Sequence, residues 1–135
     1  LRKCGVDIIR VKKWFQSDLI SFNKIAAIVK SAEIVNGSVA IAINPKKEKD
    51  TSIVCAKAAD ELLTISDITA SFVLGDMGDK ICISGRSIGD VNVQVILEKL
   101  GGGGHITLAG AQVEGKDIEE VKGELIGCIA EYFSG

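Results

Sequence analysis

The chain has 135 residues, the length of one domain, and 47% hydrophobic and 25% charged residues are typical of a soluble globular fold. Its formal net charge of -2 excludes a broad positive surface that would draw it to nucleic acid or anionic lipid. Any phosphate binding must therefore come from a few locally placed groups.

The four cysteines, Cys4, Cys55, Cys82 and Cys128, are scattered among apolar residues and form no C-x-x-C pair. Such thiols behave as small hydrophobic side chains, so we expect reduced cysteines in the core of a cytoplasmic protein. Their spacing and the single histidine, His105, argue against a zinc site. No stretch has the length and apolarity that a membrane-spanning helix needs.

The predicted elements begin with two helices, for which Asp7 and Ser17 stand in capping positions. The second helix is expected to bury one apolar stripe, made of Leu19, Phe22, Ala26 and Val29. We interpret residues 1–32 as a helical lead-in and residues 33–135 as the domain itself.

Strand signals follow the connector. Residues 33–36 and 39–43 are predicted to be strands joined at Asn36-Gly37, a strong hairpin signal. Thr51 is predicted to cap a helix that runs to about Leu63. The buried stripe of this helix is expected to be Val54, Ala58 and Leu62.

Further strands are predicted at residues 68–74 and 80–86, around a turn at 75–79, and at 111–114. Two more helices are expected, with Asp90 and Asp117 as their caps. Their buried stripes are expected to be Val93, Ile96, Leu97 and Leu100 in the first, and Ile118, Val121, Leu125, Cys128, Ile129 and Phe133 in the second. This order predicts an α/β domain with a mixed sheet of about five strands covered by helices.

The glycine run Gly101, Gly102, Gly103, Gly104, followed by His105, is the first candidate binding feature. Because a helix C-cap needs only one glycine, the others favour close approach of the backbone to a ligand. Successive N–H groups would form an anion-binding nest, and a helix after His105 would add its own N–H groups. Composition alone favours a flexible linker or a loose turn, but Leu100 before the run and Ile106 and Leu108 after it indicate that the run is anchored in the core.

Arg86 is the second candidate, at the end of a predicted strand. Cys82, Ser84 and Arg86 are expected to share one face of that strand. A guanidinium matches phosphate geometry, and Ser84 and Ser87 offer hydroxyl groups. The alternative is a surface arginine beside two turn serines. No metal-binding or Ser-His-Asp pattern accompanies these residues.

Residues 83–87 (Ile-Ser-Gly-Arg-Ser) and 100–105 (Leu-Gly-Gly-Gly-Gly-His) together resemble the two signatures of the DHH-associated domain of DHH phosphoesterases. The likeness is closer to bacterial cyclic-di-AMP phosphodiesterases, in which a stretch similar to residues 87–94 leads into the glycine block. It covers roughly residues 30–134 and implies that residues 1–32 are a helical connector from a separate catalytic domain. Leu108 departs from this pattern, since many members have alanine and the cyclic-di-AMP subgroup often has a polar residue there.

The resemblance implies a substrate-binding role for Ser84, Arg86, Ser87, His105, Thr107 and the four glycines. It assigns no catalytic residue, metal ligand or cofactor to this chain, and we expect no hydrolysis by it alone. A DHH domain of the same chain would hold manganese, whose bound water attacks the phosphodiester.

The resemblance also indicates the partners of the chain. It implies a cyclic dinucleotide or short oligonucleotide as the substrate and no direct membrane contact. A homodimer and a membrane anchor upstream in the parent protein stay open.

Two other classes of function compete with a phosphodiesterase domain. A related domain in alanyl-tRNA synthetases contacts RNA, but the net charge of -2 and an aromatic content of 4% argue against an RNA surface here. A protein-interaction domain with a glycine linker would not require the two signatures at this separation.

Overall fold

A computed structural model describes residues 19–48 and 50–135. The strands are β1 (Glu33–Val35), β2 (Val39–Asn44), β3 (Ala70–Asp76), β4 (Lys80–Ser87), β5 (Gly103–Gly104) and β6 (Leu108–Glu114). The helices are α2 (Thr51–Leu62), α3 (Val93–Glu98) and α4 (Ile118–Ser134), and another helix covers residues 19–30.

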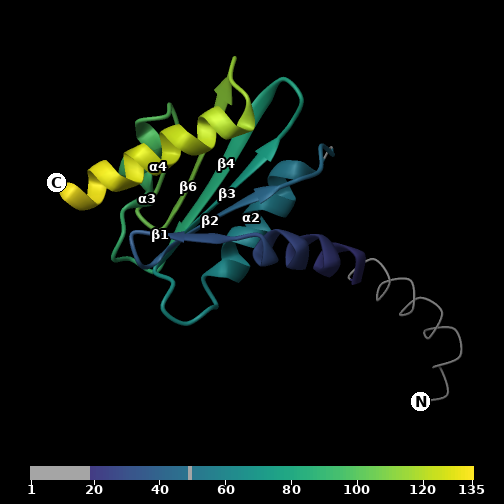
Figure 1. Cartoon of the computed structure of the whole chain (residues 1–135), viewed down its shortest axis with the longest axis horizontal. Coiled ribbons are helices and arrows are strands. Elements are labelled where there is room, and N and C mark those ends of the chain that lie inside the picture. Colours follow the sequence, from purple (N-terminus) through teal and green to yellow (C-terminus); the bar gives the residue numbers. More distant parts are fainter. Residues whose placement is uncertain (1–18, 49) are drawn as a thin grey trace, which may run out of the picture.

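One mixed sheet has the strand order β1-β2-β3-β4-β6-β5. Strands β2 and β3 are parallel and every other neighbouring pair is antiparallel. Helices α3 and α4 cover one face, and α2 with the helix over 19–30 lies on the other (Figure 1). The predicted α/β class is confirmed, with six strands in place of about five because the glycine run itself forms β5.

The first hairpin forms where the sequence predicts it. Asn36 and Gly37 both have left-handed backbones, with φ of 50° and 82°, which these two residue types tolerate best. The strands then pair from Val35 opposite Val39.

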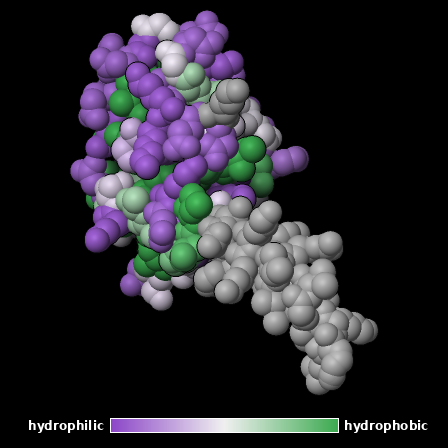
Figure 2. Space-filling model, turned by 90° about the vertical axis from the view of Figure 1, so that its right-hand side faces the viewer, coloured by the Kyte–Doolittle hydropathy of each residue, from purple (hydrophilic) through white to green (hydrophobic). Residues whose placement is uncertain are grey.

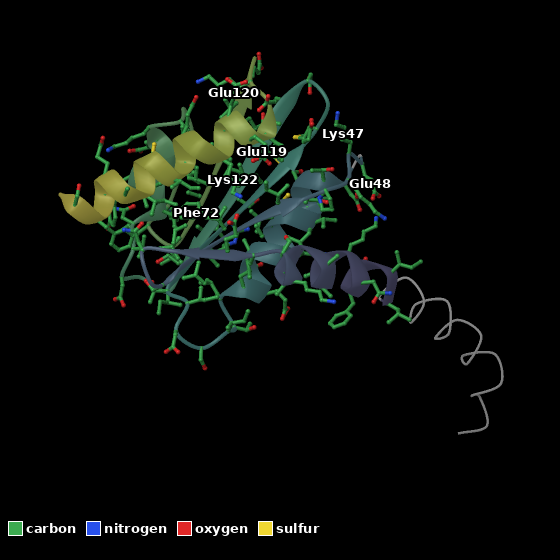
Figure 3. All side chains as sticks on the ribbon, viewed as in Figure 1. Lys47, Glu48, Phe72, Glu119, Glu120 and Lys122 are labelled. Carbon is green, nitrogen blue, oxygen red and sulfur yellow. The ribbon has the colours of Figure 1, made fainter. Side chains whose placement is uncertain are left out.

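The core has two parts, one on each face of the sheet. Along β4, Ile81 and Ile83 pack in the part beneath α3 and α4, whereas Cys82 packs in the part beneath α2. This alternation confirms the predicted facing of β4. Phe72 of β3 is fully buried on the α3 and α4 face (Figure 3).

The helix over 19–30 is oriented differently from the prediction. Leu19 and Phe22 are 45% and 63% exposed, whereas Ile28 is 1% exposed in the core beneath α2. The predicted stripe is wrong for Leu19, Phe22 and Ala26, whereas Val29 packs against the core, because the helix meets the sheet through its last turns. On the side seen in Figure 2, hydrophobic residues in green reach the surface between hydrophilic ones. Asp7 and Ser17 lie outside the described residues.

Two predicted caps are wrong. Thr51 is the first residue of α2 rather than its cap, and its hydroxyl accepts the Glu48 N–H at 2.9 Å, which ties down the preceding loop. Helix α3 is capped by Asn92, whose side chain accepts the Val95 N–H at 3.1 Å, and not by Asp90. Asp50, directly before α2, makes no side-chain cap hydrogen bond, whereas at α3 the cap is made two residues after Asp90.

Helix α4 follows its prediction more closely. Asp117 forms a capping box with Glu120. Of the predicted stripe, Val121, Leu125 and Ile129 are buried, Ile118 and Cys128 are partly buried against the core, and Phe133 is 41% exposed. Strand β3 starts at Ala70 and continues through Asp76, so Gly75 belongs to the strand and not to the turn.

Replacing Gly127 with alanine is expected to stabilise the chain by about 0.5–1 kcal/mol, because alanine loses less backbone entropy in a helix than glycine. Gly127 lies within α4, and a Cβ there would meet no atom within 4 Å. Urea unfolding followed by circular dichroism would measure the change. A decrease in stability would contradict the open space that the structure shows around Gly127.

Candidate functional site

The predicted binding residues lie in two rows across β4, β6 and β5. In the first row, Ser84 is opposite Gly110, and Gly110 is opposite Gly103. In the second, Arg86 is opposite Leu108, which exchanges backbone hydrogen bonds of 2.7 and 3.4 Å with His105. Residues two apart on a strand share a face, so both rows lie on the face that carries α2.

A hollow of about 600 Å³ opens on this face, where α2 no longer covers the sheet. Ser84, Ser52 of α2 and Gln112 of β6 provide its polar side chains, and glycines of β5 and β6 form much of its floor. Its full lining is Ser52, Cys82, Ile83, Ser84, Gly101, Gly102, Gly103, Gly110, Ala111 and Gln112. A ligand can therefore approach the backbone closely between polar groups.

The structure constrains the four positions of the glycine run in different ways. Gly101 has a left-handed φ of 86°, where the chain turns after α3. Cβ atoms on Gly102 and Gly104 would lie 2.2 and 2.5 Å from carbonyl oxygens of β6. Gly103 has neither a left-handed backbone nor any atom within 4 Å of a Cβ. The fold itself therefore does not require glycine at position 103. Gly103 lines the hollow, where a side chain would take up space for a ligand.

The run does not form the expected nest of free amides. The N–H groups of Gly101, Gly102 and His105 donate to backbone oxygens of the fold, at 3.1, 2.9 and 2.7 Å. The interpretation is wrong for these three groups because the run turns out of α3 and then pairs with β6. The segment after His105 is the β5–β6 hairpin, so it supplies no helix N-terminus.

Arg86 is held in place by α2. Its Nε donates to Asp60 Oδ1 at 2.8 Å and its Nη1 donates to the Gly85 carbonyl at 2.9 Å. The Arg86 side chain is 12% exposed, whereas that of Asp60 is 64% exposed. These bonds use two of the five guanidinium N–H groups and leave the others for a ligand. Sequence reasoning missed Asp60, because an exposed carboxylate late in a helix carries no local signal.

Ser87 does not join the hollow. It is 6% exposed on the opposite face of β4 from Ser84, and its hydroxyl accepts the Gly89 N–H at 2.9 Å. Its own N–H donates to the Thr107 carbonyl at 3.0 Å, and Val93 N–H donates to the Ile106 carbonyl at 3.0 Å. Ser87 thus anchors the hairpin that carries His105 and Thr107, both of which are exposed beyond the hollow.

Within residues 19–48 and 50–135, no three His, Cys, Asp or Glu side chains gather in a way that would hold a metal ion. The same part of the chain contains no helix long and apolar enough to cross a membrane.

Comparison with known proteins assigns the class. Residues 24–131 match the family model described as the DHHA1 domain. The chain therefore belongs to the DHHA1 domain family, which confirms the class that the two sequence signatures predicted. This matched region begins inside the helix over 19–30.

Among curated proteins, the chain is 40% identical over 136 residues to the cyclic-di-AMP phosphodiesterase PdeA of Listeria monocytogenes. It is 41% identical over 136 residues to the cyclic-di-AMP phosphodiesterase GdpP of Geobacillus thermodenitrificans. Each match covers 100% of this chain and 21% of the relative, so the chain spans about a fifth of their length.

Solved structures show the same fold. An exopolyphosphatase-related protein from Bacteroides fragilis matches with a TM-score of 0.70 and 20% identity, over 83% of this chain and 34% of its own. A pGpG-specific phosphodiesterase from Vibrio cholerae matches with a TM-score of 0.61 and 16% identity, over 91% and 42%. The C-Ala domain of Aquifex aeolicus alanyl-tRNA synthetase matches with a TM-score of 0.53 and 20% identity, over 72% and 96%.

Proposed function

We propose that this DHHA1 domain holds the substrate of a phosphodiesterase that cleaves cyclic-di-AMP or short oligonucleotides. The observation that supports this most is the hollow lined by Ser84, Gly110 and Gly103, which form one row across the sheet. Arg86 lies in the neighbouring row. The 40% identity to cyclic-di-AMP phosphodiesterases supports this substrate class over others.

The second row gives the proposed site a width suited to a nucleotide. Arg86 and His105 stand on either side of Leu108, two strand spacings or about 10 Å apart. Leu108 is 51% exposed and presents an apolar surface between two hydrogen-bond donors. In this proposal a phosphate meets Arg86 and Ser84, His105 and Thr107 contact the nucleotide from the hairpin, and a sugar or base rests on Leu108.

Cleavage is proposed to belong to a DHH domain of the same chain that holds manganese, which activates water for attack on the phosphodiester. The described residues offer no group of ligands for such a metal, so the roles proposed for them are to bind and orient. Arg86, oriented by Asp60, is the group best placed to hold a phosphate against that domain.

Calorimetric titration of the chain with cyclic-di-AMP tests the proposal. Gly103→Ala and Arg86→Ala are each expected to weaken binding at least tenfold, or about 1.4 kcal/mol, and His105→Ala to weaken it less. The alanine at position 103 fills the floor of the hollow without touching the fold. Gly127→Ala, a glycine-to-alanine change on the far side of the sheet, is the matched control and should bind normally.

Equal affinities in all four variants would contradict the assignment of the binding site to these residues. If the unmodified chain did not bind cyclic-di-AMP, the proposal that this domain binds the substrate by itself would be wrong. A single-stranded RNA of several nucleotides serves as competitor. If the RNA bound more tightly than the dinucleotide and depended on the same residues, the alternative of an RNA-binding module would be preferred.

A further inference from the structure

Two buried thiols meet where α2 packs on the sheet. Cys55 of α2 is 0% exposed and Cys82 of β4 is 4% exposed. Both are free cysteines, and both sulfurs lie beside Gly75 of β3. The proposed substrate-binding role makes no use of this pair.

Gly75 of β3, which is opposite Cys82 in the sheet, shows how closely the sulfurs share one space. A Cβ on Gly75 would lie 2.4 Å from Thr51 Cγ2, 2.6 Å from Cys55 Sγ and 3.3 Å from Cys82 Sγ. The backbone of Gly75 is not left-handed, so its conformation does not require glycine. The absence of a side chain instead leaves room for the two sulfurs and the Thr51 methyl group, which lie together against Gly75.

The environment makes the two thiols chemically different. The adjacent Cys55 thiol lowers the pKa of Cys82, and the backbone of Gly75 lowers it further. The adjacent Cys82 thiol, together with burial, raises the pKa of Cys55. A thiolate is the reactive form of cysteine, and Cys82 also lines the hollow, through which a small oxidant can reach it.

We propose that Cys55 and Cys82 form a redox modification site, at which hydrogen peroxide converts the two thiols into a disulfide between α2 and β4. The Cys82 thiolate attacks one peroxide oxygen, the O–O bond breaks, and the departing hydroxide takes up a proton to become water. The sulfur of Cys55 then loses its proton and attacks Cys82, the S–O bond breaks, and a second water leaves. The two sulfurs lose two electrons in total, and the peroxide is reduced to water.

The bond would connect α2 to β4 two residues from Ser84, at the wall of the hollow. The proposal is argued from the placement and reactivity of the two thiols, so it does not depend on the proposed substrate-binding function.

The test treats the folded 135-residue chain with hydrogen peroxide, alkylates the remaining thiols in denaturant, and maps the peptides by mass spectrometry. We expect a peptide linked through Cys55 and Cys82 that dithiothreitol releases, while Cys128 stays alkylated. Cys128→Ser is the matched control and should leave the bridge unchanged. In Cys55→Ser, Cys82 has no partner, and dimedone should trap it as a sulfenic acid.

Circular dichroism before and after peroxide checks that the chain stays folded. Alkylation of both thiols in peroxide-treated folded chain would overturn the proposal. So would a bridge to Cys4 or Cys128, or a bridge that forms only when peroxide is added to chain already unfolded in urea.

Discussion

Gly102→Ala is expected to destabilise the chain by about 1–3 kcal/mol, the usual cost of forcing a side chain into occupied space. The new Cβ would lie 2.2 Å from the Gly110 carbonyl oxygen and 2.6 Å from the Ala111 Cβ. Strand β6 cannot yield, because its other edge is paired along its whole length with β4. The segment that enters β5 must therefore move away, and we expect ligand affinity to fall with it.

Urea unfolding and calorimetric titration of the same sample would measure both effects of Gly102→Ala. Gly103→Ala is the matched control, one residue along, where a Cβ meets no atom within 4 Å. It should keep normal stability and lose only binding. Unchanged stability in Gly102→Ala would contradict the close pairing of the glycine run with β6.

Phe72→Ala is expected to destabilise the chain by about 3–5 kcal/mol, the range for removing a buried aromatic ring. Phe72 is 0% exposed beneath α3 and α4 and lies opposite Gly85 of β4. A Cβ on Gly85 would be 3.0 Å from the Phe72 ring and 3.1 Å from Leu97, so the ring occupies the space above this glycine. Its loss would leave a cavity that Gly85 has no side chain to fill.

Thermal or urea unfolding would give the free energy for Phe72→Ala, with Phe72→Leu as the control. Leucine refills part of the cavity, so it should cost clearly less than alanine. Equal costs for the two variants would show that the ring does not pack over Gly85 as the structure places it. This packing also explains why residue 85 of the Ser-Gly-Arg-Ser signature is glycine: the Phe72 ring in the core, and not a ligand, needs the space.

Features that depend on neighbouring residues could be predicted from the sequence. The Asn36-Gly37 hairpin, the facing of β4 and the Asp117 cap all follow from the conformations and spacings of a few adjacent residues. The two signature segments also sufficed to predict the DHHA1 family and the strand that carries Ser84 and Arg86.

The tertiary structure decided how those residues combine. The glycine run became a strand, and Asp60 came to bind Arg86, because segments far apart in the sequence met. Register across three strands, not spacing along the chain, aligned Ser84 with Gly103. Local propensity extends over a few residues, whereas close approach between backbones depends on the packing of the whole sheet.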